Sequence, residues 1–206
     1  MKNHFLRILE LLFPSTQDEK NLASVSSSHF ISLYIERYNL GIVSLSYFNQ
    51  PEIRSAIHLN KFHGHRKARN YLGLLLSKYV ETLEEDEYLL IPIPLSSKRH
   101  RKRGYNQVTV IAENTLKNNS YPQITLATTI LTRNKDTKPQ TSLSKTDRLS
   151  NLKDVFTVSE ANGKLVAGKK IILLDDVTTT GTTFREAKAA LLLHNPALVI
   201  CVACAQ

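Results

Sequence analysis

The 206-residue chain has little of what builds disulfide-rich domains or membrane spans. It has two cysteines, Cys201 and Cys204, which are too few for a disulfide framework. No run of 18 uninterrupted apolar residues occurs, and the apolar stretch at 5–13 is too short and too charged for a membrane span or a signal peptide. We therefore expect a soluble, cytoplasmic protein that does not insert into membranes.

The two cysteines have the C-x-x-C spacing that is also found in zinc and redox sites. They lie in the apolar segment 197–204, which favours a buried strand. Residues three apart on a strand point to opposite faces, so these thiols cannot easily share a metal ion. We interpret both as small core residues, with a metal or redox site as the alternative.

Acidic residues are scarcer than basic ones, 18 against 27, which gives a net charge of +9. The excess is concentrated at 98–103, where five of six residues are Lys or Arg, and an acidic run at 84–87 partly balances it. Such a basic run is either a solvated surface or a contact for a polyanion. The two polyanions to consider are pyrophosphate and nucleic acid.

Hydrophobic periodicity predicts an α/β fold in which helices flank a mostly parallel central sheet. A chain of this length, 42% hydrophobic, suits one full core. The N-terminal segment, 1–30, would hold a short helix that ends before Pro14 and a loosely held, serine-rich stretch at 15–29. The main domain, 31–206, would hold a hairpin at 33–48, helices at 51–60, 66–83 and 107–117, and strands at 88–94, 124–131, 171–174 and 197–204.

The most informative stretch is 171–183: four apolar residues, two adjacent acids and five threonines around one glycine. The apolar run suits a strand buried on both faces of a parallel sheet. Asp175 and Asp176 follow at the carboxyl end of this strand, where α/β sheets bind ligands. On a regular strand their side chains would diverge, unless the backbone has begun to turn.

A helix begins directly after these threonines, because Thr183 and Glu186 have the spacing of a capping box. The preceding loop therefore lies at a helix N-terminus, where free N–H groups bind phosphate. Its residues are Thr178, Thr179, Thr180, Gly181 and Thr182. Acids beside a phosphate site suit the hydroxyls of an attached sugar, which indicates a sugar 5-phosphate. The alternative is a capped helix without a ligand, although capping alone needs one hydroxyl.

Residues 163–170 have the spacing of another phosphate motif, the P-loop, but lack its final Ser or Thr. A P-loop must follow a strand and open a helix. This segment precedes a strand instead, so we interpret it as a polar turn and the match as chance.

A basic segment lies between the strand at 88–94 and the helix at 107–117. We expect it to be a cationic loop that binds pyrophosphate, since the arginine fork meets two phosphate oxygens at once. The candidate ligands of pyrophosphate are Ser96, Arg99, Arg103 and Gly104. An exposed basic turn is the alternative.

The long polar stretch at 133–151 is of the kind that forms lids or floppy connections. A cationic lid would stabilise the charge that develops on a pyrophosphate leaving group. Its candidate residues are Arg133, Lys138, Gln140 and Arg148. By contrast, we interpret 61–65, which contains Lys61, His63 and His65, as a turn with a surface lysine, and assign its histidines no chemistry.

The stretch 171–183 resembles the phosphoribosyl-pyrophosphate (PRPP) signature of type I phosphoribosyltransferases. With 11–14, 61–64, 92–107 and 137–156, the chain resembles the ComF family of competence proteins. The resemblance implies a type I phosphoribosyltransferase fold and PRPP with Mg²⁺ as the ligand. In type I phosphoribosyltransferases the paired acids hold ribose hydroxyls and the loop that follows them holds the 5-phosphate. Some members act in DNA uptake during natural competence.

This sequence departs from the family in one place, because members usually carry zinc-binding cysteines near 15–29 and it has none there. We therefore expect no zinc, and expect Mg²⁺ to be held through PRPP itself. Two functions remain open. One is phosphoribosyl transfer to an unknown acceptor with Asp175 and Asp176 in the catalytic site. The other is a non-enzymatic module of the DNA-uptake machinery that binds a single-stranded nucleic acid, such as DNA, or a nucleotide, with Tyr105 stacking on a base.

Overall fold

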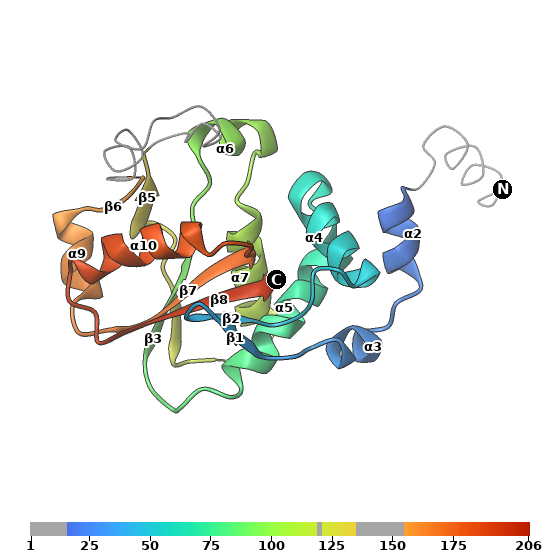
Figure 1. Cartoon of the computed structure of the whole chain (residues 1–206), viewed down its shortest axis with the longest axis horizontal. Helices are drawn as coiled ribbons and strands as arrows, with labels where there is room; N and C mark the ends of the chain where they lie inside the picture. The colour runs from blue at the N-terminus through green and yellow to red at the C-terminus, as the bar shows by residue number, and fades with distance from the viewer. Residues whose placement is uncertain (1–15, 119–120, 135–154) are drawn as a thin grey trace.

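A six-stranded sheet forms the centre of the computed structural model, which describes residues 16–118, 121–134 and 155–206 (Figure 1). The strand order is β1-β2-β8-β7-β3-β4. Neighbouring strands from β2 to β4 are parallel, and β1 pairs antiparallel with β2 at one edge. The bounds are β1 Arg37–Asn39, β2 Ile42–Ser44, β3 Tyr88–Pro92, β4 Ile124–Leu126, β7 Lys170–Val177 and β8 Leu198–Ala205. The predicted α/β fold with a mostly parallel sheet is confirmed.

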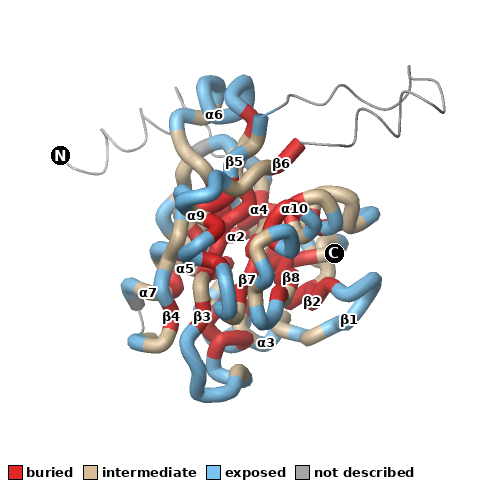
Figure 2. The backbone as a smooth tube through the Cα atoms, turned by 90° about the vertical axis from the view of Figure 1, so that its left-hand side faces the viewer, coloured by how far each residue is buried: buried red, intermediate tan, exposed pale blue. Residues whose placement is uncertain are grey.

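Helices cover both faces of this sheet (Figure 1). Ile172 and Leu174 of β7 belong to one core, shared with α4 (Pro51–His63), α5 (Arg66–Val80) and α7 (Gln107–Asn118). Ile171 and Leu173 belong to the other, shared with α9 (Glu160–Val166) and α10 (Thr182–Leu192). Alternate residues of β7 are thus buried on opposite faces, as the unbroken apolar run predicts. Figure 2 shows buried backbone concentrated in the strands and in the helices that face them.

The same alternation separates the two cysteines. Cys201 lies in the core with α9 and α10, and Cys204 in the core with α4 and α5. Both are free and buried, and burial raises the pKa of each thiol, that of Cys201 to about 11. Their interpretation as core residues is confirmed.

The serine-rich stretch is helical, so the expectation of a loosely held segment is wrong. It forms α2 (Gln17–Ala23) and α3 (Ser27–Ser32), whose Leu22 and Phe30 are fully buried. The hydroxyls responsible for the wrong prediction cap these helices, because Thr16 and Ser26 accept first-turn N–H groups. A separate unit at 1–30 stays a prediction, and the helix expected before Pro14 lies outside the described residues.

Three further predictions need correction. The strand expected at 124–131 is divided between β4 and β5 (Leu131–Arg133), which pairs with β6 (Phe156–Val158) in a second sheet. The expected cationic loop is a helix, α6 (Ser97–Arg103), since Ser96 caps its start and Gly104 ends it in the left-handed conformation. Part of the expected polar turn at 163–170 is helix α9, which Ser159 caps. Because this segment precedes β7, the P-loop match is indeed chance.

Across the described part of the chain, no helix combines the length and the apolar character that a bilayer crossing requires.

Candidate functional site

A cavity of about 480 Å³ lies at the carboxyl ends of β3 and β7. This is the edge at which open α/β sheets bind ligands. Seven segments of the chain line it: His58, Lys61 and Phe62 of α4; Ile93, Pro94 and Leu95 after β3; Arg99 and Arg103 of α6; Gln107 of α7; Arg133 of β5; Asp175, Asp176 and Val177 of β7; and Thr183 of α10. We call the β7 acids together with residues 178–183 the signature wall, and His58, Lys61 and Phe62 the helix wall.

The two acids of the signature wall are still part of β7, so the backbone has not turned where they lie. The Asp176 side chain is only 6% exposed, and its Oδ2 lies 3.3 Å from Lys61 Nζ. That oxygen has no hydrogen-bond partner among the described residues. Asp175 Oδ1 accepts the backbone N–H of Asp176 at 2.8 Å. Both residues line the cavity although they are neighbours on a strand.

The enclosure of these acids changes the proton affinity of Asp175. Desolvation, followed by the nearby charge of Asp176, raises the pKa of Asp175, and the Lys61 ammonium opposes this rise. Removal from water disfavours a carboxylate unless donors or cations compensate. The acid pair is therefore under-compensated, which favours a ligand that brings hydroxyl donors or a cation.

The threonine loop differs in detail from its prediction. Helix α10 begins at Thr182 with Gly181 as its N-cap, and no side-chain cap is formed, so the predicted capping box at Thr183 is wrong. Gly181 has a φ of +70°, and a Cβ there would lie 2.8 Å from Ile42 Cδ1. This conformation, which glycine tolerates best, lets the backbone fold tightly around the start of α10.

Only Thr183 of the signature-wall threonines lines the cavity itself. Thr178 is buried and its N–H donates to the carbonyl of Ala205, while the hydroxyls of Thr180 and Thr182 lie 3.0 Å apart. The first N–H groups of an α-helix have no partner within the helix. The loop therefore adjoins the cavity with the donors that a phosphate needs, and its role in phosphate binding stays a prediction.

Two of the four predicted pyrophosphate ligands reach the cavity. Arg99 and Arg103 are four residues apart on α6, which places them on one face of the helix. The Arg103 guanidinium lies 5.4 Å from the centre of the Phe62 ring and donates to Gln107 Oε1 at 2.8 Å. Ser96 and Gly104 instead occupy the cap positions of α6. The structure thus gives them a role in forming the helix.

One residue of the predicted lid lies at the cavity. Arg133 lines it from the end of β5, and its guanidinium lies 5.1 Å from the centre of the Phe156 ring. Lys138, Gln140 and Arg148 lie outside the described residues.

Sequence reasoning missed the helix wall. The interpretation of Lys61 as a surface lysine in a turn is wrong, because it lies in α4, is 22% exposed and pairs with Asp176. His58 also lines the cavity, and no pattern in the sequence points to it. The available signal for Lys61 was the family-like element at 61–64. Tyr105 anchors this region, since its hydroxyl donates to the carbonyl of Asn60 and accepts the N–H of Gly64.

Comparison with known proteins shows the family of this chain. The family model of the phosphoribosyl transferase domain matches residues 92–206, which include both acids, α6 and the threonine loop. A DNA utilization protein, YhgH of Salmonella typhimurium, is 30% identical over 168 residues, which cover 79% of this chain and 70% of that protein. The chain belongs to the ComF family of the phosphoribosyltransferase superfamily.

Other ComF-family relatives are longer than the segment matched. Competence protein F of Haemophilus influenzae is 33% identical over 116 residues, 56% of this chain and 48% of that protein. Competence protein ComFC of Bacillus subtilis is 30% identical over 116 residues, 56% of this chain and 43% of that protein. The match thus spans about half the length of these two relatives.

Solved structures also resemble the chain. The glutamine PRPP amidotransferase from B. subtilis, complexed with ADP and GMP, is 17% identical and has a TM-score of 0.42, covering 88% of this chain and 31% of that chain. The allosteric regulatory enzyme of purine biosynthesis is 18% identical with a TM-score of 0.41, covering 88% and 30%. Membership of the ComF family rests on the sequence matches.

Proposed function

We propose that this ComF-family chain binds PRPP with Mg²⁺ in the cavity and transfers the phosphoribosyl group to an acceptor. The observation that carries the proposal is the acid pair at the end of β7. Both acids line a cavity that Arg99, Arg103 and Arg133 also line, and the buried Oδ2 of Asp176 has no hydrogen-bond partner in the part of the chain that the structure describes. A ligand that is rich in both hydroxyls and negative charge would satisfy both features.

The parts of PRPP match the parts of the cavity. The ribose hydroxyls would donate to Asp175 and Asp176, and Arg99 and Arg103 would hold the pyrophosphate. The 5-phosphate would accept N–H groups of residues 179–182 at the start of α10, since the N–H of Thr178 already donates to Ala205. Mg²⁺ keeps several waters and binds through substrate phosphates, and when bound it would neutralise charge on the pyrophosphate. The acid pair suits it as an acceptor of hydrogen bonds from those waters.

Catalysis in such a site would consist of positioning and charge stabilisation. The acceptor attacks the ribose C1 carbon while the bond to pyrophosphate breaks, and negative charge grows on the leaving group. Arg99 and Arg103 would stabilise that charge, with Arg103 held in place by Phe62 and Gln107. The acceptor itself remains to be found by assay.

Calorimetry with PRPP and Mg²⁺ tests this proposal directly. The double variant Asp175→Asn, Asp176→Asn should lose PRPP binding. The matched control is Glu84→Gln, Asp86→Asn, which removes the same charge beside Lys170 at the opposite end of β7 and should bind as the wild type does. No binding by the wild type, or equal binding by both double variants, would overturn the proposal.

A second candidate function is the binding of single-stranded DNA, favoured by the outer face of α6. Lys98, Arg101 and Lys102 are exposed there and do not line the cavity, so their charge serves no part of the PRPP site. Cations spaced along a surface bind the phosphate backbone, and such binding weakens steeply with salt. A role in DNA uptake, association with uptake proteins and a cytoplasmic location belong to this same proposal.

The triple variant Lys98→Ala, Arg101→Ala, Lys102→Ala separates the two functions. It should weaken binding of an oligothymidylate and reduce the slope of affinity against salt, while PRPP binding stays unchanged. Unchanged oligothymidylate binding, or none by the wild type, would contradict the second function and leave the first intact.

A further inference from the structure

The helix wall carries a histidine that phosphoribosyl transfer, as described so far, does not use. His58 lines the cavity from α4, one turn before Lys61. Its ring packs edge-on against Phe48, with the ring centres 6.2 Å apart. Its Nδ1 lies 3.3 Å from Asp18 Oδ2 of α2. A charged side chain from the N-terminal part of the chain thus reaches the wall of the cavity.

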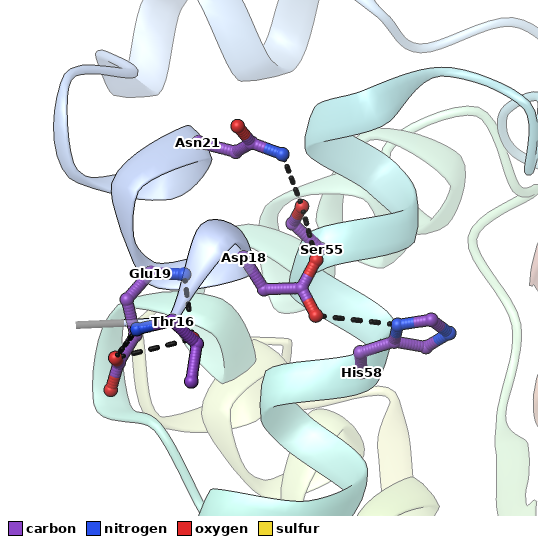
Figure 3. A network of polar contacts seen from close by, with 6 residues as sticks. All are labelled: Thr16, Asp18, Glu19, Asn21, Ser55 and His58. Carbon is purple, nitrogen blue, oxygen red and sulfur yellow. Dashed lines mark hydrogen bonds and ion pairs between the residues drawn. The ribbon is translucent and has the colours of Figure 1, made fainter. Parts of the chain in front are cut away.

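Asp18 is itself held firmly from both sides (Figure 3). Its other oxygen, Oδ1, accepts the hydroxyl of Ser55 at 2.9 Å, and Ser55 is fully buried. Asn21 donates its side-chain amide to the same hydroxyl at 3.2 Å. Asp18 also lies in the first turn of α2, which the capping box of Thr16 and Glu19 fixes. Both carboxylate oxygens are therefore committed.

This contact determines which nitrogen of His58 is available. A carboxylate only accepts hydrogen bonds, so Nδ1 carries the proton toward Asp18 and Nε2 keeps its lone pair. Figure 3 shows the ring with its second nitrogen directed away from Asp18. An Asp–His pair of this kind orients the imidazole, which is the arrangement that general bases use.

We propose that His58 takes the proton of the acceptor nucleophile, and that Asp18 is its positioning residue. This inference rests on the proposed function. The acceptor's N–H or O–H group forms the new bond to the ribose C1 carbon with its lone pair. The bond from C1 to pyrophosphate breaks, its electron pair leaves with pyrophosphate, and the proton passes to His58 Nε2. The acceptor class is thus a nitrogen or oxygen nucleophile with a removable proton.

Other charged groups share the cavity and bear on its pH dependence. They are Lys61 from α4, Arg99 and Arg103 from α6, Arg133 from β5, and Asp175 and Asp176 from β7. Lys61 is engaged with Asp176. The arginines stay protonated and cannot accept a proton. An imidazole nitrogen with a lone pair can accept one.

The test measures pyrophosphate release by the full chain with Mg²⁺ and PRPP. Ammonia, free purine and pyrimidine bases, and water are screened as acceptors, and the fastest is kept. His58→Gln should lower kcat by about 10²–10⁴-fold, while PRPP affinity by calorimetry stays within about twofold. Added imidazole should restore part of the activity of His58→Ala. Asp18→Asn should lower kcat and displace the acidic limb of the pH profile.

The control variant is His29→Gln. His29 also pairs with a carboxylate, since its Nε2 lies 3.4 Å from Glu52 Oε1, but it does not line the cavity. Its kcat should equal that of the wild type. Unfolding temperatures are measured for all variants, and rescue by imidazole excludes misfolding as the cause of a lost rate.

Two results would overturn the role of His58. These are a kcat for His58→Gln above a third of the wild-type value, and no effect of imidazole on His58→Ala. A wild type that fails to bind PRPP in calorimetry, or that binds it but releases no pyrophosphate with any acceptor, overturns the proposed function instead, before any variant is made.

Discussion

The two walls of the cavity obtain their residues in different ways. In the signature wall, consecutive residues of β7 and of the turn into α10 carry the acids and the threonines. In the helix wall, a single turn of α4 is carried to the cavity by the packing of α2, α3 and α5 around it. The first wall depends on local chain geometry, whereas the second depends on tertiary packing far from the cavity.

The walls also differ in charge, and one ion pair joins them. Asp175 and Asp176 make the signature wall acidic. Lys61 of the helix wall forms an ion pair with it, since its Nζ lies 3.3 Å from Asp176 Oδ2. Each wall therefore affects the electrostatics of the other. A change in either wall should be visible in stability as well as in ligand binding, which gives four tests.

The largest effect should come from removing support behind the helix wall. Phe30 is fully buried in α3, and its ring centre lies 4.6 Å from that of Tyr71 in α5. Phe30→Ala should lower the free energy of unfolding in urea by about 3–5 kcal/mol. Phe62→Ala, at a side chain that is 58% exposed, should lower it by less than about 1 kcal/mol. Equal losses would show that α3 does not support the wall.

The ion pair between the walls comes next. Lys61→Met keeps the length of the side chain but leaves Asp176, 6% exposed, without its counter-charge. We expect a loss of about 2–3 kcal/mol in unfolding free energy at neutral pH, and a further rise in the pKa of Asp175. The control, Lys78→Met, breaks an exposed pair with Glu81 and should leave the unfolding free energy close to that of the wild type. Similar losses of unfolding free energy in both variants would show that the ion pair between the walls does not stabilise the protein more than an exposed pair does.

Within the signature wall, Gly181 tests the tight turn. Gly181→Ala places a Cβ at 2.8 Å from Ile42 Cδ1 at a φ of +70°, and should destabilise the protein by about 2 kcal/mol in thermal unfolding. Gly168→Ala has the same φ of +70° with no atom within 4 Å, so it measures the backbone term alone. Adding Ile42→Val to Gly181→Ala should reduce the loss of stability to that of Gly168→Ala. If the loss does not shrink, the contact with Ile42 does not contribute to it.

The smallest effect should be a change in how the free energy of unfolding depends on pH, caused by Asp175. The pKa of Asp175 is raised from 3.8 to about 8 in the folded protein. Between these two values the folded state binds more protons than the unfolded state, so the free energy of unfolding falls as the pH rises from about 4 to about 8. Asp175→Asn removes this loss, so the variant should gain on the wild type by about 1.4 kcal/mol or more between pH 4 and pH 8 in urea unfolding.

Asp86→Asn should change the pH dependence of stability in the opposite direction. Its hydrogen bond to Lys170 lowers the pKa of Asp86, so its contribution to stability is present above the ordinary pKa and is lost in acid. If the unfolding free energies of Asp175→Asn and the wild type change with pH in parallel, the pKa of Asp175 is not raised in the folded state.

The signature wall could be predicted from the sequence, because everything that defines it is contiguous. The apolar run 171–174 fixed the strand, and the acids and threonines followed directly. The sequence error there was local, since the cap of α10 is Gly181 and not Thr183. The helix α6 was also within reach, because Ser96 and Gly104 are its cap signals, but its six-residue cationic run favoured a loop prediction.

The helix wall could not be predicted in this way. Lys61 meets Asp176 only once α4 packs against the sheet, and nothing in residues 61–65 reports that partner. The same holds for β4 and β5, which look like one apolar segment but join different sheets. The serine-rich stretch at 15–29 led to the wrong prediction of a loosely held segment for a related reason. A serine is equally suited to a loop and to the cap of a helix that packs in the core.

The opposite placement of the two cysteines gives the protein a pair of internal probes. Cys201 reports on the layer of α9 and α10, and Cys204 on the layer of α4 and α5. A buried thiol with a raised pKa reacts with a disulfide reagent only when its surroundings open. The two rates of thiol exchange in the native protein would thus time the opening of each layer separately, without a label and without any engineered residue.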